Sequence, residues 1–138
     1  MPTPQRITFV LDDLFTPETR EMSDEVLGYL LSALTALDVA YLKAHPGTPL
    51  IYESGVVYQE EPPGAEDWAN IPMVLKLGWG DCEELACWRA AELQVRGNLG
   101  ARAGFTKQTQ PDGTMLYHIV VLLPDGRTED PSRQLGMR

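Results

Sequence analysis

Apolar residues recur with a helical period in the first half of the chain. The segment 23–44 is predicted to be a long scaffold helix, with Ser23 as its N-cap, two acidic residues in its first turn and Pro46-Gly47 as its stop. Its apolar stripe comprises Val26, Leu30, Ala33, Leu34, Leu37 and Tyr41. Before it, residues 6–11 alternate apolar and polar positions, which predicts a short strand. We expect the long helix to pack its stripe into the core.

The middle of the chain predicts a strand, a loop and two helices. Residues 50–58 are rich in β-branched and aromatic side chains and predict a strand with a bend at Gly55, followed by a loop over 59–64. A short helix is expected over 66–76, with Pro72 limiting its regularity. A second helix is predicted over 82–96 and ends at Gly97-Asn98. Its polar stripe is narrow, which is typical of a buried central helix, and consists of Arg89, Glu92 and Arg96.

The last third of the chain predicts an antiparallel sheet. Strands are expected over 101–109, 114–123 and 127–131, joined by turns at Pro111-Asp112-Gly113 and Pro124-Asp125-Gly126. The middle strand is apolar on both faces, so we expect it inside the sheet and covered on each side. The predicted fold class is therefore α+β, with helices packed against an antiparallel β-sheet.

The second turn determines which residues of the last two strands share a face. In a three-residue loop with Gly126 left-handed, Leu123 pairs with Arg127 and paired residue numbers add up to 250. His118 then opposes Ser132, Asp130 lies diagonally beside His118, and Glu129 points to the other face. A two-residue loop instead sends Asp130 to the other face. Pro131 also keeps Asp130 extended.

Length and charge limit the classes of function. The chain has 138 residues, which fits one domain of roughly 150 residues. Its net charge is −9 and its basic residues do not cluster, so neither nucleic acid nor an anionic membrane is an expected partner. We find no apolar run approaching the roughly 18 residues of a membrane span, and no signal peptide, which predicts a cytoplasmic protein.

The two cysteines are expected to be free thiols with different roles. Five positions apart on one helix, Cys82 and Cys87 point about 140° apart, which is poor geometry for a disulfide. Cys82 lies at the predicted helix start, where unpaired N–H groups and the helix dipole favour the thiolate. The acidic residues beside it, Asp81, Glu83 and Glu84, oppose the thiolate, and a cationic His118 is the candidate partner that reverses this balance. The expected oxyanion donors are the backbone N–H of Cys82 and the indole of Trp79, although Trp79 equally fits a packing role.

Three short blocks in this order resemble the transglutaminase-like superfamily of the papain-like cysteine protease fold. They are Gly80-Asp81-Cys82-Glu83-Glu84-Leu85-Ala86, Tyr117-His118-Ile119-Val120-Val121, and Asp125-Gly126 leading to Asp130-Pro131-Ser132. The resemblance implies that Cys82 is a nucleophile at the N-terminus of a central helix, His118 the base and later acid, and Asp130 the residue that orients the imidazole. It implies one domain over 1–138, with a catalytic core over 66–136 and an N-terminal helical and strand scaffold over 1–65. Small members of this kind resemble phage and prophage proteins.

Three hypotheses follow for function. The first is a thiol-dependent acyl-transfer enzyme that acts on peptide or side-chain amides, as a protease, an amidase or a transglutaminase, without a cofactor or metal. The acidic chain favours a peptide or protein substrate that is lysine-bearing or neutral around the reacting amide. The second is a non-catalytic phage structural or assembly protein, with virion or tail proteins as partners. The third uses Cys82, His118 and Asp130 as metal ligands around an open position.

Overall fold

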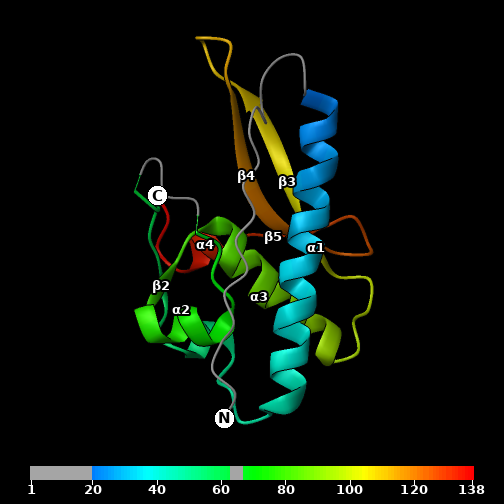
Figure 1. The fold of residues 1–138 in the computed structure, drawn as a ribbon, viewed down its shortest axis with the longest axis vertical. Coiled ribbons are helices and arrows are strands. Elements are labelled where there is room, and N and C mark those ends of the chain that lie inside the picture. Colours follow the sequence, from blue (N-terminus) through cyan, green and yellow to red (C-terminus); the bar gives the residue numbers. More distant parts are fainter. Residues whose placement is uncertain (1–19, 63–66) are drawn as a thin grey trace.

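The structure is a computed structural model, and it describes residues 20–62 and 67–138 (Figure 1). Helix α1 spans Arg20–Ala44 and confirms the predicted long helix. It begins before Ser23, so this residue lies buried inside the helix and the prediction that it caps the helix is wrong. The buried side of α1 belongs to the core through Leu27, Leu31 and Leu34. The predicted apolar stripe is therefore only partly right, since Leu37 is 55% exposed. The strand predicted over 6–11 lies outside the described residues.

Helix α1 also has the length and apolarity of a membrane span. Its segment Met22–Ala44 contains an 18-residue window with a mean hydropathy of 1.4, so the prediction that no segment approaches these properties is wrong. The same test is passed by core helices of soluble proteins. Leu31, which is fully buried in a core cluster shared with Ala86 and Cys87, shows that one side of α1 serves as core.

Helix α3, Cys82–Val95, is the buried centre of the fold, as predicted. Its start is fixed by a capping box: the Asp81 side chain accepts a hydrogen bond from the backbone N–H of Glu84, and the Glu84 side chain accepts one from the backbone N–H of Asp81. Two core clusters lie against it, one shared with α1 and the sheet and the other with α2. Trp88 is fully buried in the cluster that α3 shares with α2. Glu92, predicted on the polar stripe, is instead buried and accepts a hydrogen bond from the backbone N–H of Ile51.

The predicted sheet is confirmed in its order and its register. Strands β3 (Arg102–Thr109), β4 (Met115–Leu122) and β5 (Thr128–Glu129) form an antiparallel sheet with β4 in the middle. Strand β5 is shorter than predicted because helix α4 (Pro131–Gln134) begins directly after Asp130. The expectation that β4 is covered along both faces is wrong at one end, where Leu116 is 51% exposed.

The connection between α1 and α3 differs most from the prediction. The expected strand over 50–58 is a 3-10 turn, η2 (Ile51–Glu53), followed by strand β1 of only two residues (Val57–Tyr58). Strand β1 pairs in parallel with β2 (Trp79–Gly80), so its partner comes from a distant part of the chain. Helix α2 spans Ile71–Leu77 and is shorter than expected, since Pro72 falls in its first turn, where proline is favoured.

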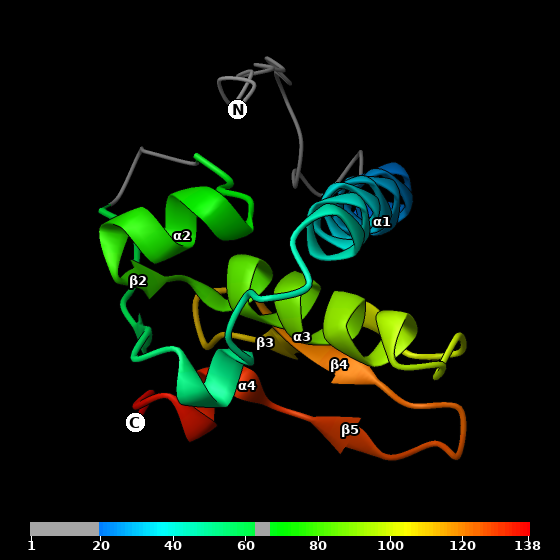
Figure 2. The same ribbon diagram turned by 90° about the horizontal axis from the view of Figure 1, so that it is seen from below.

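The elements form layers with the sheet on one side. Figure 2 shows α3 lying over β3 and β4, with α1 beyond it and α2 to one side. The fold is therefore mixed, with helices packed on a small antiparallel sheet, in agreement with the predicted α+β class. This arrangement places the N-terminus of α3 near the middle strand of the sheet.

Candidate active site

His118 and Asp130 are brought together as the turn geometry predicts. The pairs Val121 with Glu129 and Leu122 with Thr128 give the expected register, and Gly126 has a positive φ of 88°. The Nε2 atom of His118 lies 2.7 Å from Oδ2 of Asp130. The predicted proximity is confirmed, although Asp130 follows β5 rather than belonging to it and Ser132 lies in α4 instead of opposite His118.

The Asp130 carboxylate is held from a second side. Its Oδ1 caps α4 by accepting a hydrogen bond of 3.2 Å from the backbone N–H of Arg133, whose side-chain Nε lies 3.5 Å from Oδ2. An ionised carboxylate only accepts hydrogen bonds, so a neutral His118 carries its proton on Nε2 and presents Nδ1 as the free acceptor. Both side chains are partly exposed, at 21% and 25%, so a substrate can reach them.

Glu129 points to the opposite face, as predicted, and there it enters an ionic network. Arg89 of α3 donates to Glu129 through Nε at 2.6 Å, and the Tyr52 hydroxyl donates to the same carboxylate at 2.6 Å. Arg89 also pairs with Glu92 at 3.1 Å and lies 5.0 Å above the Tyr52 ring. This network ties the two-residue strand β5 to α3, and Asp130 is the next residue along the chain.

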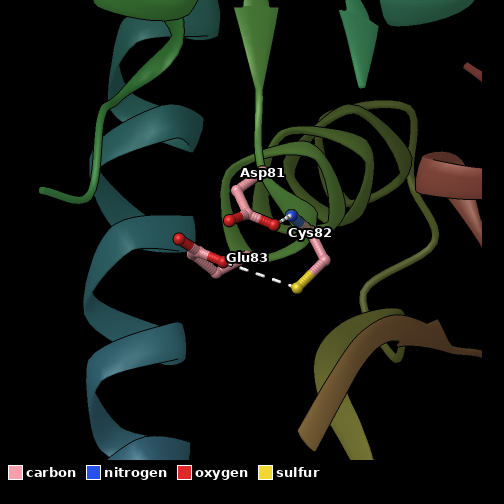
Figure 3. A group of neighbouring side chains, drawn as sticks. All are labelled: Asp81, Cys82 and Glu83. Carbon is pink, nitrogen blue, oxygen red and sulfur yellow. Dashed lines mark hydrogen bonds between the residues drawn. The ribbon is translucent and has the colours of Figure 1, made fainter. Parts of the chain in front are cut away.

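Cys82 occupies the first position of α3, but its surroundings differ from the expected ones. Its backbone N–H donates to Oδ1 of Asp81 at 2.7 Å, so the N–H expected to serve as an oxyanion donor is already used. Its sulfur donates to Oε2 of Glu83 at 3.5 Å. Figure 3 shows Asp81 and Glu83 on either side of this turn, with the sulfur extending toward the strands of the sheet.

Ionisation of the Cys82 thiol is strongly unfavourable in this arrangement. Burial is the largest cause that raises the pKa of Cys82, followed by the charge of Glu83, while the backbone amide of Ile119 in β4 acts in the opposite direction. Burial and the negative neighbours therefore act against the thiolate that the helix terminus favours. Burial and the charge of Asp81 likewise raise the pKa of Glu83 to about 8.

The thiol and His118 are close in the fold but not hydrogen-bonded. Within the part of the chain that the structure describes, the hydrogen-bond partner of the Cys82 sulfur is Glu83, and that of the His118 ring is Asp130. Alternation along β4 explains this: Ile119 and Val121 face the helices, so His118 belongs to the other face. The sulfur reaches the backbone amide of Ile119, the residue that follows His118 in the strand.

Carboxylates of α1, of the start of α3 and of the segment itself hold the segment that leads into α2. Each accepts a hydrogen bond from a backbone N–H of that segment, the pairs being Glu61 N–H with Asp81, Asp67 N–H with Glu61, Ala69 N–H with Glu84, and Ile71 N–H with Asp38. The described residues contain two groups with ligand atoms within 4.8 Å of one another, which are Asp81 with Cys82 and Glu83, and Glu61 with Glu83 and Glu84. Cys82, His118 and Asp130 do not form such a group, so the metal hypothesis for these three residues is not supported.

The other singled-out residues have distinct surroundings. Trp79 lies in β2, paired with Val57, and is partly buried. Its role as an oxyanion donor stays a prediction. Cys87 is fully buried and its sulfur donates to the carbonyl of Leu31 at 3.4 Å, which agrees with the expected inert thiol.

Sequence reasoning missed two residues that shape this site. Glu83 was expected only to add negative charge, and nothing in the helical periodicity identifies it as the partner of the sulfur. Arg89 was placed on a polar stripe, and its partner Glu129 is expected only to point away from His118. One signal in the sequence could have identified the partners of Arg89: charged residues on a helix as buried as this one need partners of opposite charge.

Comparison of the chain with protein-family models, with curated proteins and with solved structures finds no match. The candidate site therefore stands on its own geometry.

Proposed function

We propose that this protein is a thiol-dependent acyl-transfer enzyme in which Cys82 is the nucleophile, His118 the general base and acid, and Asp130 the orienting acid. The observation that carries the proposal is the His118–Asp130 pair of 2.7 Å, which presents Nδ1 of the imidazole at the strand position next to the amide that the Cys82 sulfur faces. The order helix thiol, strand histidine and acid after the next strand also supports a papain-like core of the transglutaminase-like kind.

The reaction would proceed through a thioester. Nδ1 of His118 takes the thiol proton while Sγ of Cys82 attacks the carbonyl carbon of an amide, and the carbonyl electron pair moves to oxygen. When the tetrahedral intermediate collapses, the C–N bond breaks and the amine leaves with the proton from His118. Water or a second amine then attacks the thioester, gives its proton to His118, and releases Cys82, which recovers the proton. Asp130 stabilises the imidazolium at each stage.

The charge around the thiol supports a substrate that is cationic or neutral near the reacting amide. Asp81, Glu61 and Glu83 lie at the start of α3, and the whole chain carries a net charge of −9. Acidic groups close to the nucleophile repel acidic substrates and attract lysine-bearing ones. A peptide or protein is therefore the proposed substrate class, with the protein acting in the cytoplasm or, for a phage-encoded chain, on virion or tail proteins.

The test of this proposal is the dependence of Cys82 reactivity on His118. Iodoacetamide labelling, resolved by peptide mass spectrometry, would be followed near neutral pH in wild type, in His118→Ala and in His45→Ala, the latter removing the only other histidine of the chain. We expect His118→Ala to slow Cys82 labelling about tenfold or more, with His45→Ala unchanged. An activated ester such as p-nitrophenyl acetate should also leave an acetyl group on Cys82, and this acyl-enzyme should hydrolyse more slowly in His118→Ala.

The alternative is the non-catalytic protein, and the raised pKa of the buried Cys82 thiol favours it. It predicts equal labelling rates in all three proteins and no acyl-enzyme turnover that depends on His118. That result would leave the His118–Asp130 pair with a structural role only and would refute the proposed activity.

A further inference from the structure

Glu83 is a buried acid whose contact is with the thiol. It is 6% exposed, and its Oε2 accepts the hydrogen bond of the Cys82 sulfur at 3.5 Å. None of the ion pairs within residues 20–62 and 67–138 involves Glu83, although Arg89 and Lys107 pair with other carboxylates. A buried carboxyl group without a cation is costly, so its position against the nucleophile needs an explanation.

We propose that the charged carboxylate of Glu83 is a positioning group that holds Cys82 protonated and turned away from His118, so that the site is unreactive whenever Glu83 is ionised. The inference rests on the proposed function, because it assigns a regulation to the same nucleophile. The reactive form arises when Glu83 is neutral and the sulfur turns toward Nδ1 of His118. Glu83 thereby makes the reactivity of Cys82 depend on its own charge.

The geometry gives the physical reason for this effect. A thiol that donates to a carboxylate must keep its proton, and the ionised form would place two negative charges 3.5 Å apart in a poorly hydrated turn. The same hydrogen bond aims the sulfur at Glu83 rather than at the ring of His118. A neutral Glu83 removes the repulsion and weakens the bond that holds the sulfur.

Other titratable groups surround the pair, and they define which controls are needed. They are Asp81 and Glu84 on the same turn, Glu61 in the loop before α2, Tyr58 of β1, His118 of β4, and Asp38 of α1, which lies with Glu83 and Glu84 around Cys87. Asp81 and Glu84 are tied to backbone N–H groups by the capping box, and Asp38 to that of Ile71. Of these carboxylates, Glu83 alone accepts the hydrogen bond of the Cys82 sulfur.

Burial raises the pKa of Glu83 to about 8, so its charge changes in an accessible range. The sign of the effect follows directly. Below this pKa Glu83 is mostly neutral and its replacement changes little. Above it the carboxylate opposes the thiolate, so the labelling rate of wild type should rise less steeply with pH than that of a variant without the charge.

The experiment is a pH profile of Cys82 labelling by iodoacetamide from about pH 6.5 to about pH 9 in wild type and Glu83→Gln, with Glu60→Gln as the matched control. Glu60 is exposed and lies near Tyr58, as Glu83 does. Its replacement by glutamine removes the same formal charge without changing a contact of the sulfur. We expect Glu83→Gln to label Cys82 about tenfold faster than wild type near pH 9 and about equally near pH 6.5, with Glu60→Gln following wild type. A second variant, Glu83→Met, has a similar length without charge and should show the same rise if Glu83→Gln folds poorly.

Coincident profiles of wild type and both Glu83 variants would overturn the inference, as would a rise of the same size in Glu60→Gln. Adding His118→Ala to Glu83→Gln separates the inference from the proposed function. If the rise near pH 9 persists without His118 and His118→Ala alone has no effect, Glu83 controls the thiol but the Cys–His mechanism fails. If His118→Ala slows labelling in both backgrounds while Glu83→Gln changes nothing, the mechanism stands and the role of Glu83 is refuted.

Discussion

Two arginine–carboxylate pairs with the same distance allow a sharp test of how burial determines the value of an ion pair. Arg89 and Glu129 approach to 2.6 Å with side chains 15% and 20% exposed. Arg127 and Asp125 also approach to 2.6 Å, but their side chains are 76% and 51% exposed. Replacement of each arginine by leucine removes the same contact in two different environments.

We expect Arg89→Leu to lower the free energy of unfolding by about 3 kcal/mol, the lower end for a broken buried pair because both side chains keep some contact with water. The loss includes the contact of Arg89 with the Tyr52 ring and leaves Glu92, whose side chain is 2% exposed, without its cation. For a chain of this size the thermal midpoint should fall by about 10 °C. Arg127→Leu should leave the midpoint unchanged, because its partner Asp125 is exposed to water.

The assay is urea unfolding followed by far-UV circular dichroism, with Glu129→Gln and the double variant completing a mutant cycle. The coupling free energy between positions 89 and 129 should be at least about 1 kcal/mol. Equal midpoints for Arg89→Leu and Arg127→Leu, or strictly additive effects in the cycle, would refute the reasoning that this network anchors β5 to α3.

Three further predictions concern single groups. Burial raises the pKa of Asp38 to about 8, well above its unfolded value, so its contribution to stability is present at low pH and is lost as pH rises toward 8. Asp38→Asn should therefore flatten the decline of unfolding free energy between about pH 4 and pH 8, by up to about 1.4 kcal/mol per pH unit, and an unchanged slope in urea titrations would contradict this. Limiting iodoacetamide should label Cys82 before the fully buried Cys87, and the reverse order in peptide mass spectra would show that burial does not govern access. Asp130→Asn should leave the circular dichroism spectrum unchanged but slow hydrolysis of an acyl group on Cys82 at least about tenfold, because an amide cannot stabilise the imidazolium of His118; wild-type turnover would remove Asp130 from the mechanism.

The sequence by itself determined the elements whose cause is local. Helix α3 begins and ends as predicted because Asp81 caps it and Gly97 follows its last turn. The turn around Gly126 is a short-range feature for which the sequence left a two-residue and a three-residue form open, and the three-residue form in the structure places Asp130 beside His118. Periodicity and turn chemistry act over a few residues, so the sequence of one chain can show them.

Only the tertiary structure decided the features that depend on distant partners. Strand β1 is only two residues long and pairs with β2, which lies far along the chain. Pro72 falls in the first turn of α2 rather than limiting the helix from inside. The sulfur of Cys82 donates to Glu83 rather than to His118, because alternation along β4 places His118 on the face away from the helices. Burial also determines which carboxylates keep a raised pKa, and burial is a property of the packed chain that no local pattern encodes.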